Sequence, residues 1–491
     1  MILDYEYKNG NLLLSYFNEK GAIEFKSQPW PNVMQWEVCS DKDISKSDEY
    51  KTWNGKPVKL SRTRWPNRYT IYEHLRKLSE DEQKDIFGYN KPKVWFCDIE
   101  VEITQGFPEA HLAENSVTSI SLINGNNVVL LGIKPLTDKQ IEQMEVDMNN
   151  YFEKFDKQYK IKWIYCETEY DLMDILFNII IPKIPVMTGW NFIKYDWVYL
   201  VTRARKIGIN PNVASPTGEL IKPWQKDDSD YKPIYEELPK HRMIFDYMDI
   251  FEKWDNSIKI RESMSLDFIS SAILDAQKLE YDGTLKDLYH DDWYTYSLYN
   301  CIDTALVQLI DEQQKTFDIM LSIANLAKID VKSVLSQLRV TEGVLFDTYY
   351  KNGIVMVKQK SVSSGDDDDE EKEFSGGYVK FPSVGLKMWV VVFDFASLYP
   401  TTMRQFNIAP ESYKGMKISD TECLMDGVKR KIEPTDIILL NGAVFKNEES
   451  GTKTVLSNIY SSRKSNKFYS LNFQKKLKLI ENYKNNRKSI A

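Results

Sequence analysis

The chain has 491 residues, of which 42% are hydrophobic and 28% charged, and its net charge is −8. This composition excludes a disordered chain, and five scattered cysteines without a C-x-x-C pair argue against a disulfide framework or a thiolate zinc site. The longest apolar run, around residues 175–181, falls short of the ~20 residues of a bilayer span. We therefore expect a cytoplasmic protein that is neither secreted nor membrane-bound.

The first 92 residues alternate short strand-like runs with turns and end in a helical patch, and they carry no motif of readable chemistry. From residue 93 the pattern changes. Strands are predicted over 94–103, 117–123, 126–133, 162–166 and 184–190, with helices over 138–159 and 169–177. This order predicts an α/β layer structure with a mixed sheet.

The remainder divides by composition. Helical segments are predicted from 265 to 317 and on to about 351, and residues 366–373 (DDDDEEKE) read as a solvated linker. The apolar run 388–393 predicts a strand. Residues 451–491 carry ten basic side chains and one acidic, and they predict an amphipathic helix that begins near Leu456.

Two acidic residues interrupt the first apolar strand of the sheet. Side chains at i and i+2 of a strand share a face, so Asp98 and Glu100 project together, whereas Cys97 and Ile99 face the opposite layer. A buried pair of carboxylates requires a neutralising cation, which favours a site for a hard ion such as Mg²⁺ or Mn²⁺. Exposed acids on an edge strand are the alternative reading.

Three further residues complete a candidate constellation. Asp196 follows a strand and a turn in a very apolar segment, and Tyr299 and Asp303 are spaced i, i+4 on a predicted helix. Taken singly, an aspartate near a turn is usually a helix cap, and a tyrosine four residues before an aspartate is usually a surface hydrogen bond. Taken together, four carboxylates can hold two divalent ions about 4 Å apart, with a tyrosine hydroxyl orienting the attacking water.

The order DIE, GWNxxxYD and YNxxD resembles the three exonuclease motifs of family B DNA polymerases, and the intervening text is similar to replicases of T-even-type phages. The resemblance implies an RNase H-like, DEDD-type 3′-to-5′ exonuclease. By position, Asp98, Glu100, Asp196 and Asp303 match its metal-binding acids and Tyr299 its water-orienting tyrosine. Glu102, a further acid on the same strand face, departs from the pattern.

Single-stranded 3′ ends are expected in the nuclease cleft, with bases stacked on aromatic rings. Phe192 and Trp197, which flank Asp196, are candidates for this stacking, although core packing is the commoner role for either ring. The stretch 217–242, with turn signals and mixed charges, is a candidate for the strand-separating hairpin of related phage enzymes.

The string DFASLYP resembles the first palm motif of the same family. The resemblance implies that Asp394 is a catalytic metal ligand and that Phe395 contributes a backbone carbonyl to the metal. It also implies that Ser397 and Leu398 lie along the incoming deoxynucleoside triphosphate and that Tyr399 is a steric gate against the 2′-hydroxyl. Phosphate binding is implied for the fingers residues Arg463 and Lys467. Close contact with DNA is implied for Gly376, Gly377 and Tyr378.

The resulting division of the chain combines an α+β N-terminal domain, an exonuclease domain and an incomplete palm and fingers. Its segments are 1–92 (rejoined by 326–358), 93–325 for the exonuclease, 359–375 for the acidic linker, 376–455 for the partial palm and 456–491 for the start of the fingers helix.

The later family motifs, K-x-x-x-N-S-x-Y-G and D-T-D-S, do not occur in the sequence, so we expect no synthesis by this polypeptide alone. The preferred function is the N-terminal part of a viral replicative polymerase that acts in the host cytoplasm on single-stranded 3′ ends and primer-template DNA. A separate C-terminal half is the expected partner, and a sliding clamp is a candidate. The alternatives are an autonomous exonuclease and a non-catalytic nucleic-acid-binding fragment.

Overall fold

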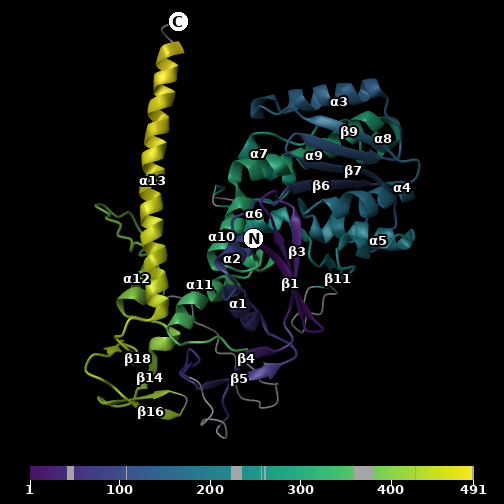
Figure 1. Cartoon of the computed structure of the whole chain (residues 1–491). Helices are drawn as coiled ribbons and strands as arrows, with labels where there is room; N and C mark the ends of the chain where they lie inside the picture. Colours follow the sequence, from purple (N-terminus) through teal and green to yellow (C-terminus); the bar gives the residue numbers. More distant parts are fainter. Residues whose placement is uncertain are drawn as a thin grey trace. The chain divides into compact units, whose positions relative to one another are not determined.

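Two separate stretches of sequence build each of the two units of the chain. Residues 1–32 and 74–343 form unit 1, and residues 33–73 and 344–491 form unit 2. The computed structural model (Figure 1) describes the whole chain except residues 41–48, 105, 107, 223–234, 256, 259, 260, 359–379, 426 and 489–491. In the described part, no helix is long and apolar enough to cross a membrane, and all five cysteines are free.

A six-stranded mixed sheet forms the centre of unit 1, in the order β13-β10-β6-β7-β8-β9. The pairs β6–β7 and β7–β8 are antiparallel, and β10–β6, β10–β13 and β8–β9 are parallel. This mixed sheet confirms the predicted α/β arrangement. The strands are β6 (Val94–Val101), β7 (Val117–Asn124), β8 (Asn127–Gly132), β9 (Lys160–Tyr165), β10 (Val186–Gly189) and β13 (Met243–Asp246).

Helices cover both faces of this sheet (Figure 1). Cys97, Ile99 and Val101 pack into a core with α4 (Glu169–Asp174), the π-helical segment Ile175–Ile180 and α5 (Val198–Lys206). The opposite face of β6 and β7 contacts α9 (Trp293–Gln314). Because side chains alternate along β6, Asp98 and Glu100 share the face opposite Cys97 and Ile99, as predicted, and this face meets α9.

A glycine allows the chain to turn closely past β6. Gly189 ends β10, and a Cβ atom there would lie 2.2 Å from the Cys97 carbonyl oxygen and 2.9 Å from the Phe192 ring. Any side chain would therefore push apart the strand that carries Asp98 and the segment that leads to Asp196.

The remaining elements of unit 1 surround this sheet and include a three-stranded antiparallel sheet, β1-β2-β3, at the N-terminus. They are β1 (Ile2–Lys8), β2 (Asn11–Phe17), β3 (Ile23–Pro29), α2 (Glu80–Phe87), α3 (Asp138–Tyr151), α6 (Tyr247–Trp254), α7 (Leu266–Leu274), α8 (Leu285–Asp291) and α10 (Thr316–Ala327). Two short strands, β11 (Leu220–Ile221) and β12 (Leu238–Pro239), pair antiparallel at the base of the predicted hairpin, of which residues 223–234 lie outside the described part.

Unit 2 contains a hairpin and a five-stranded antiparallel sheet of order β16-β15-β14-β18-β17. Helix α1 (Arg68–Arg76) and helix α11 (Gln337–Lys351) each run from one unit into the other along the sequence. The other elements are β4 (Val33–Val38), β5 (Val58–Thr63), α12 (Leu398–Gln405), β14 (Tyr413–Lys417), β15 (Glu422–Met425), β16 (Val428–Lys431), β17 (Ile437–Ile438), β18 (Ala443–Phe445) and α13 (Gly451–Lys488).

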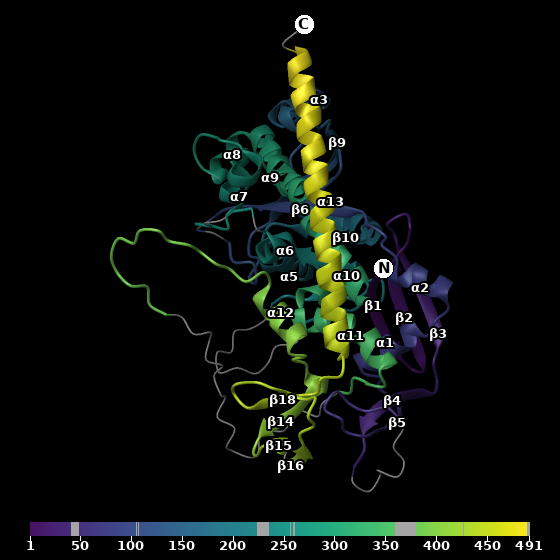
Figure 2. The ribbon, with the colours of Figure 1, turned by 90° about the vertical axis from the view of Figure 1, so that its left-hand side faces the viewer.

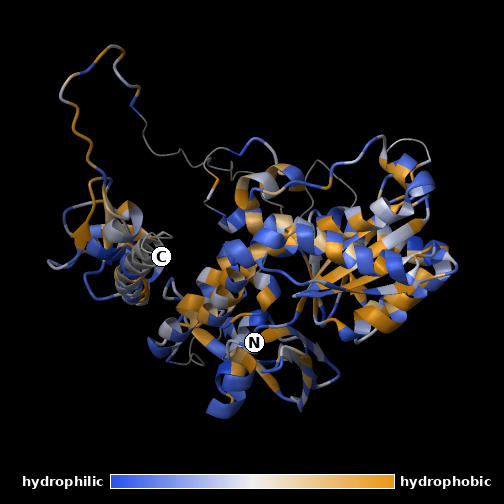
Figure 3. Ribbon diagram, turned by 90° about the horizontal axis from the view of Figure 1, so that it is seen from above, coloured by the Kyte–Doolittle hydropathy of each residue, from blue (hydrophilic) through white to orange (hydrophobic). Residues whose placement is uncertain are grey.

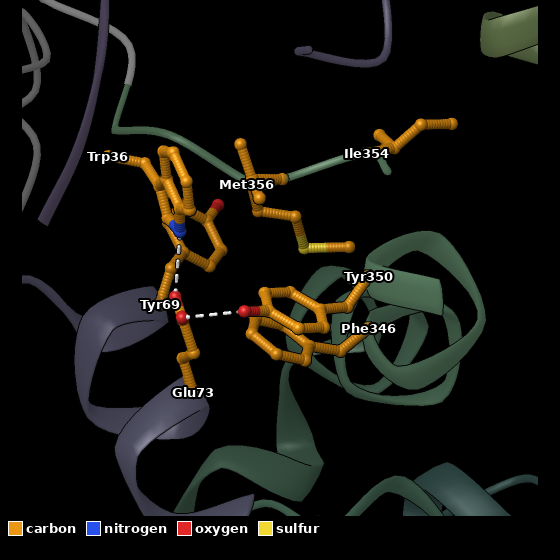
Figure 4. Close-up of a pocket in the computed structure, with 8 residues that line it drawn as sticks. Trp36, Tyr69, Glu73, Phe346, Tyr350, Ile354 and Met356 are labelled. Carbon is orange, nitrogen blue, oxygen red and sulfur yellow. Dashed lines mark hydrogen bonds between the residues drawn. The ribbon is translucent and has the colours of Figure 1, made fainter. Parts of the chain in front are cut away.

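A carboxylate joins the two sequence stretches of unit 2 (Figure 4). Glu73 accepts hydrogen bonds from the Trp36 indole at 2.9 Å and from the Tyr350 hydroxyl at 3.1 Å. The pocket that these residues line with Phe346 and Met356 has a volume of about 10 Å³. Since one water needs about 10–15 Å³, this pocket is too small for an organic ligand, and its role is structural.

The predicted strand over 388–393 is not present. Residues 380–397 form an extended loop without regular secondary structure (Figure 2), and many of them are hydrophobic (Figure 3). The exposed fractions of Trp389, Val392 and Phe393 are 95%, 85% and 91%. The strand prediction is wrong for this structure because a strand needs a neighbouring strand to bond its backbone, and the described residues provide none to this loop.

Helix α13 begins five residues before the predicted start. The Ser450 hydroxyl accepts a hydrogen bond from the Lys453 amide at 3.1 Å, and the Glu411 carboxylate accepts one from the Thr452 amide at 2.8 Å. These acceptors satisfy amide groups of the first turn, so the helix starts at Gly451. The Glu411 contact joins residues 41 positions apart, which a local pattern does not reveal.

Candidate active site

Three elements of unit 1 carry the acidic residues of the predicted nuclease site. Asp98 and Glu100 lie on β6, Asp196 lies on the π-helical segment Ile193–Trp197 that follows β10, and Tyr299 and Asp303 lie on α9. Glu100, Asp196 and Asp303 are buried, with exposed fractions of 8%, 5% and 3%. The structure thus collects at one place side chains that are up to 205 positions apart in the sequence.

Hydrogen bonds fix the three elements to one another. The Ile99 amide of β6 donates to Asp196 Oδ1 at 3.2 Å. Asn300 of α9 donates from Nδ2 to Asp98 Oδ2 at 2.7 Å, and its own Oδ1 accepts a hydrogen bond from Ser119 Oγ at 3.1 Å. Asp98 and Asp196 are therefore oriented by neighbouring elements, and Asn300, the asparagine of the YNxxD motif, is a positioning residue to which the sequence analysis gave no role.

Burial and mutual repulsion dominate the electrostatics of the carboxylates. Burial, followed by the charge of Asp303, raises the pKa of Asp98 to about 7. The pKa of Glu100 is raised well above its usual range by burial and then by the charges of Asp98 and Asp303, and that of Asp196 by burial and then by Asp98. The four acids form one coupled cluster whose ionised form requires positive charge.

A lysine that the sequence analysis missed supplies positive charge to this cluster. Lys278 lies between α7 and α8; its Nζ forms an ion pair with Asp303 Oδ2 and donates to the Tyr299 hydroxyl at 3.0 Å. Both contacts confirm that Tyr299 and Asp303 share one face of α9. A buried acidic cluster signals the need for a basic partner, but only the tertiary structure shows which lysine fills it.

The donor set is suited to hard divalent ions. The second oxygen of Asp303, Oδ1, is buried and has no hydrogen-bond partner. Carboxylate oxygens are the ligands that Mg²⁺ and Mn²⁺ prefer. Within the described residues, however, no three carboxylate, imidazole or thiolate side chains are gathered closely enough to hold an ion as they stand, and Lys278 and Asn300 take up two of the oxygens.

The two aromatic residues that flank Asp196 belong to the core. Phe192 and Trp197 have no exposed surface, and the Trp197 indole donates to the Glu237 carbonyl at 2.7 Å. They therefore cannot stack on bases in this structure. Glu102 lies beyond the end of β6, and its charge acts on Lys134, Tyr289 and Arg203.

A hollow of about 270 Å³ lies beside Asp196 and contains other aromatic rings. His111 and Tyr235 stack with ring centroids 4.4 Å apart, and Tyr195, the residue before Asp196, also lines the hollow. Its rim carries charges of both signs, from Glu109, Lys194 and Glu236. The volume is close to the lower end of typical ligand pockets, about 300 Å³.

In unit 2, the structure brings together two of the residues predicted to bind nucleotide. Arg463 of α13 donates from Nη1 to Ser397 Oγ at 2.9 Å. Arg404 of α12 donates to Ser457 Oγ at 3.0 Å, and its guanidinium lies 4.7 Å from the centroid of the Tyr460 ring. These contacts hold both ends of α12 against α13.

The other predicted polymerase residues lie near this contact in sequence but differ in surroundings. Asp394 and Phe395 belong to the exposed loop, Leu398 and Tyr399 open α12 with exposed side chains, and Lys467 is exposed on α13, one turn after Arg463. Gly376, Gly377 and Tyr378, like the whole of the predicted linker 359–375, lie outside the described residues.

Two family models match separate parts of the chain. Residues 38–267 match the family model of the DNA polymerase family B exonuclease domain, and residues 330–468 match that of DNA polymerase family B. The first match contains Asp98, Glu100 and Asp196, and the second contains Asp394 and Arg463. The chain belongs to the family B DNA polymerases.

Individual relatives agree with this assignment. The chain is 25% identical to the DNA-directed DNA polymerase of Escherichia phage RB69, over 83% of this chain and 46% of that protein. It is 28% identical to the DNA-directed DNA polymerase of Enterobacteria phage T4, over 51% of this chain and 27% of that protein. The DNA polymerase catalytic subunit of equine herpesvirus 2 is 25% identical over 69% of this chain and 32% of its own length. The chain spans less than half the length of these relatives.

Proposed function

We propose that unit 1 is a 3′-to-5′ exonuclease of the RNase H-like DEDD type, which removes nucleotides from single-stranded DNA ends. One observation carries this proposal: β6, the segment after β10, and α9 converge to place four coupled carboxylates in one buried cluster. A protein gains no stability from such mutual repulsion, so the cluster is better explained by a cationic ligand than by folding.

The carboxylates Asp98, Glu100, Asp196 and Asp303 would hold two Mg²⁺ or Mn²⁺ ions. When bound, such ions stabilise negative charge on the phosphate and lower the pKa of water. Burial, followed by the charge of Asp303, raises the pKa of Tyr299, so its hydroxyl stays protonated and can donate a hydrogen bond that orients water. The Lys278 ammonium, bonded to that hydroxyl, adds positive charge beside the scissile phosphate.

We further propose that the hollow beside Asp196 receives unpaired bases of the strand. Tyr195 joins this hollow to the acidic cluster, since the charges of Asp196, Glu100 and Asp98 all act on its hydroxyl. The stacked rings of His111 and Tyr235 offer apolar faces, and stacking accepts any base. These rings take the role first considered for Phe192 and Trp197.

A direct assay tests the exonuclease proposal. The purified chain should shorten a 5′-labelled single-stranded oligodeoxynucleotide in the presence of Mg²⁺ and stop when the ion is chelated. Asp98→Ala should lower the rate by about a hundredfold or more, because the cluster loses a ligand. Glu142→Ala, which removes an exposed acid on α3, should not. Equal rates for Asp98→Ala and the unaltered chain would refute the proposal.

For unit 2, we propose part of a polymerase site that is completed by the C-terminal portion of a polymerase. The support is the contact of Arg463 with Ser397 and the exposed apolar loop that carries Asp394. Such a large exposed apolar stretch marks a surface for a protein partner, and a β-strand is the form in which it would pair. Deoxynucleoside triphosphate and primer-template DNA are the proposed substrates, and a sliding clamp remains a candidate partner.

A further inference from the structure

Lys278 is held in place by its surroundings. Its backbone amide donates to Asp267 Oδ1 at 3.1 Å, and the preceding Gln277 carbonyl accepts a hydrogen bond from the Tyr151 hydroxyl at 2.7 Å. Tyr281, three residues later, packs its edge against the Tyr299 ring with centroids 5.5 Å apart. The segment between α7 and α8 is thus anchored on both sides of Lys278, and the ammonium is directed at α9.

The ammonium acts on most of the acidic cluster. Its positive charge lowers the pKa values of Asp98, Glu100 and Asp303, against the effect of burial. One lysine faces four carboxylates, so it neutralises only part of their charge. It also occupies Asp303 Oδ2, an oxygen of a proposed metal ligand, while Oδ1 of the same carboxylate has no partner.

We propose that Lys278 is an internal counter-ion that competes with divalent ions for Asp303 and is released from this carboxylate when the DNA phosphate arrives. The proposal rests on the exonuclease function above. The side chain of Lys278 is 33% exposed, so its ammonium can turn toward an anion at the mouth of the site while the Tyr299 hydroxyl remains in reach. The phosphate then frees a ligand oxygen, and DNA and ion bind cooperatively.

This exchange makes a quantitative prediction for ion binding. Because coupling between two ligands is reciprocal, an oligonucleotide that draws the ammonium away should tighten ion binding. Lys278→Met removes the competitor, so the ion should bind the free protein about tenfold more tightly, within the usual range of coupling of roughly 5- to 150-fold. In that variant the oligonucleotide should no longer improve ion affinity.

Isothermal titration with Mn²⁺ tests both predictions without measuring catalysis. Titrations are performed with and without a single-stranded oligodeoxynucleotide whose 3′-terminal linkages are phosphorothioates, which resist hydrolysis. Lys278→Arg keeps the charge and should behave like the unaltered chain. Lys286→Met, on α8, removes an exposed lysine whose Nζ contacts only the Thr104 carbonyl among the described residues. This variant should leave the Mn²⁺ affinity unchanged both with and without the oligonucleotide.

The outcomes separate this proposal from the function on which it rests. If Lys278→Met binds Mn²⁺ as the unaltered chain does, or more weakly, while Asp98→Asn weakens binding, the counter-ion proposal is wrong and the nuclease site stands. If the unaltered chain does not bind Mn²⁺, or if Asp98→Asn does not weaken the binding, both proposals fail. Circular dichroism of each variant shows that it is folded.

Discussion

His241 is a buried ionisable side chain of unit 1 that is separate from the acidic cluster. Its ring has no exposed surface; Nδ1 lies 2.9 Å from Ser15 Oγ, and Nε2, which has no hydrogen-bond partner, lies 3.7 Å from Glu6 Oε2. Burial lowers the pKa of His241, against the raising effect of Asp4 and Glu6 and in the same direction as Lys332. Lys240, bonded to Glu6, is the further charge at this contact. His241 therefore joins β1 and β2 to the turn between β12 and β13.

This burial predicts a pH dependence of stability. Above the pKa of histidine in the unfolded chain, about 6.5, His241 is neutral in the folded and in the unfolded state. Below that pH, the unfolded chain binds the proton first. The free energy of unfolding therefore decreases as the pH decreases, by up to about 1.4 kcal/mol per pH unit. His241→Asn removes this slope, and asparagine tolerates the left-handed backbone of this residue (φ 56°). In urea unfolding from pH 8 to 5, the free energies of unfolding of the unaltered chain and of His241→Asn should converge as the pH decreases. Parallel curves would contradict this prediction.

At the scale of elements, tertiary contacts decide where several segments begin and how they are held. Ser450 and Glu411 set the start of α13, and Gly189 permits the close approach of the segment after β10 to β6. Glu73 connects α1 to β4 through Trp36 and to α11 through Tyr350 (Figure 4). Each of these contacts joins residues that are distant in sequence.

The Glu73 connection predicts a large stability loss on mutation. Glu73→Ala leaves the Trp36 and Tyr350 donors without their acceptor, and hydrogen bonds to a charged group contribute about 1.5–3 kcal/mol each. We expect unit 2 to lose about 2–4 kcal/mol of its free energy of unfolding. Glu37→Ala, at an exposed position of β4 in the same unit, should change it by less than about 0.5 kcal/mol. Denaturant unfolding followed by tryptophan fluorescence measures both, and similar losses would show that Glu73 has no special role.

At the scale of the whole molecule, the two units differ in how complete their proposed sites are. The acidic cluster draws all its residues from unit 1, whereas in unit 2 Asp394 lies in an exposed apolar loop without a strand to pair with among the described residues. Hydrophobic exposure on this scale is unfavourable in water, at about 25 cal/mol for each Å² of apolar surface. Burial against a partner would remove that cost.

Reconstitution tests this difference. Primer extension should occur when the chain is mixed with a polypeptide that carries the N-S-x-Y-G and D-T-D-S motifs, and not with either component alone. In the mixture, Asp394→Ala should reduce extension by about a hundredfold or more and leave trimming intact, whereas Asp98→Ala should do the reverse. Trimming without extension in the mixture would favour an autonomous exonuclease. The absence of both trimming and extension would favour a non-catalytic nucleic-acid-binding fragment.

The order of strands and helices in the exonuclease region, and the shared face of Asp98 and Glu100, could be predicted from the sequence because alternation and helical spacing are local properties. The spacing of Tyr299 and Asp303 likewise fixed their common face on α9. Lys278 and the His111–Tyr235 stack could not be predicted, since each contact joins residues more than twenty positions apart in the sequence. Asn300 lies in the YNxxD motif, but its bond to Asp98 joins residues of two distant elements.

The sequence by itself determined the family and the mixed α/β region, and it picked out the acids that the structure brings together, because motifs and periodic patterns are formed by neighbouring residues. The tertiary structure alone decided which cation neutralises the acids, that Phe192 and Trp197 belong to the core, and that the apolar run before Asp394 stays unpaired. The physical reason is that burial, ion pairing and strand pairing depend on segments that meet only after the chain has folded.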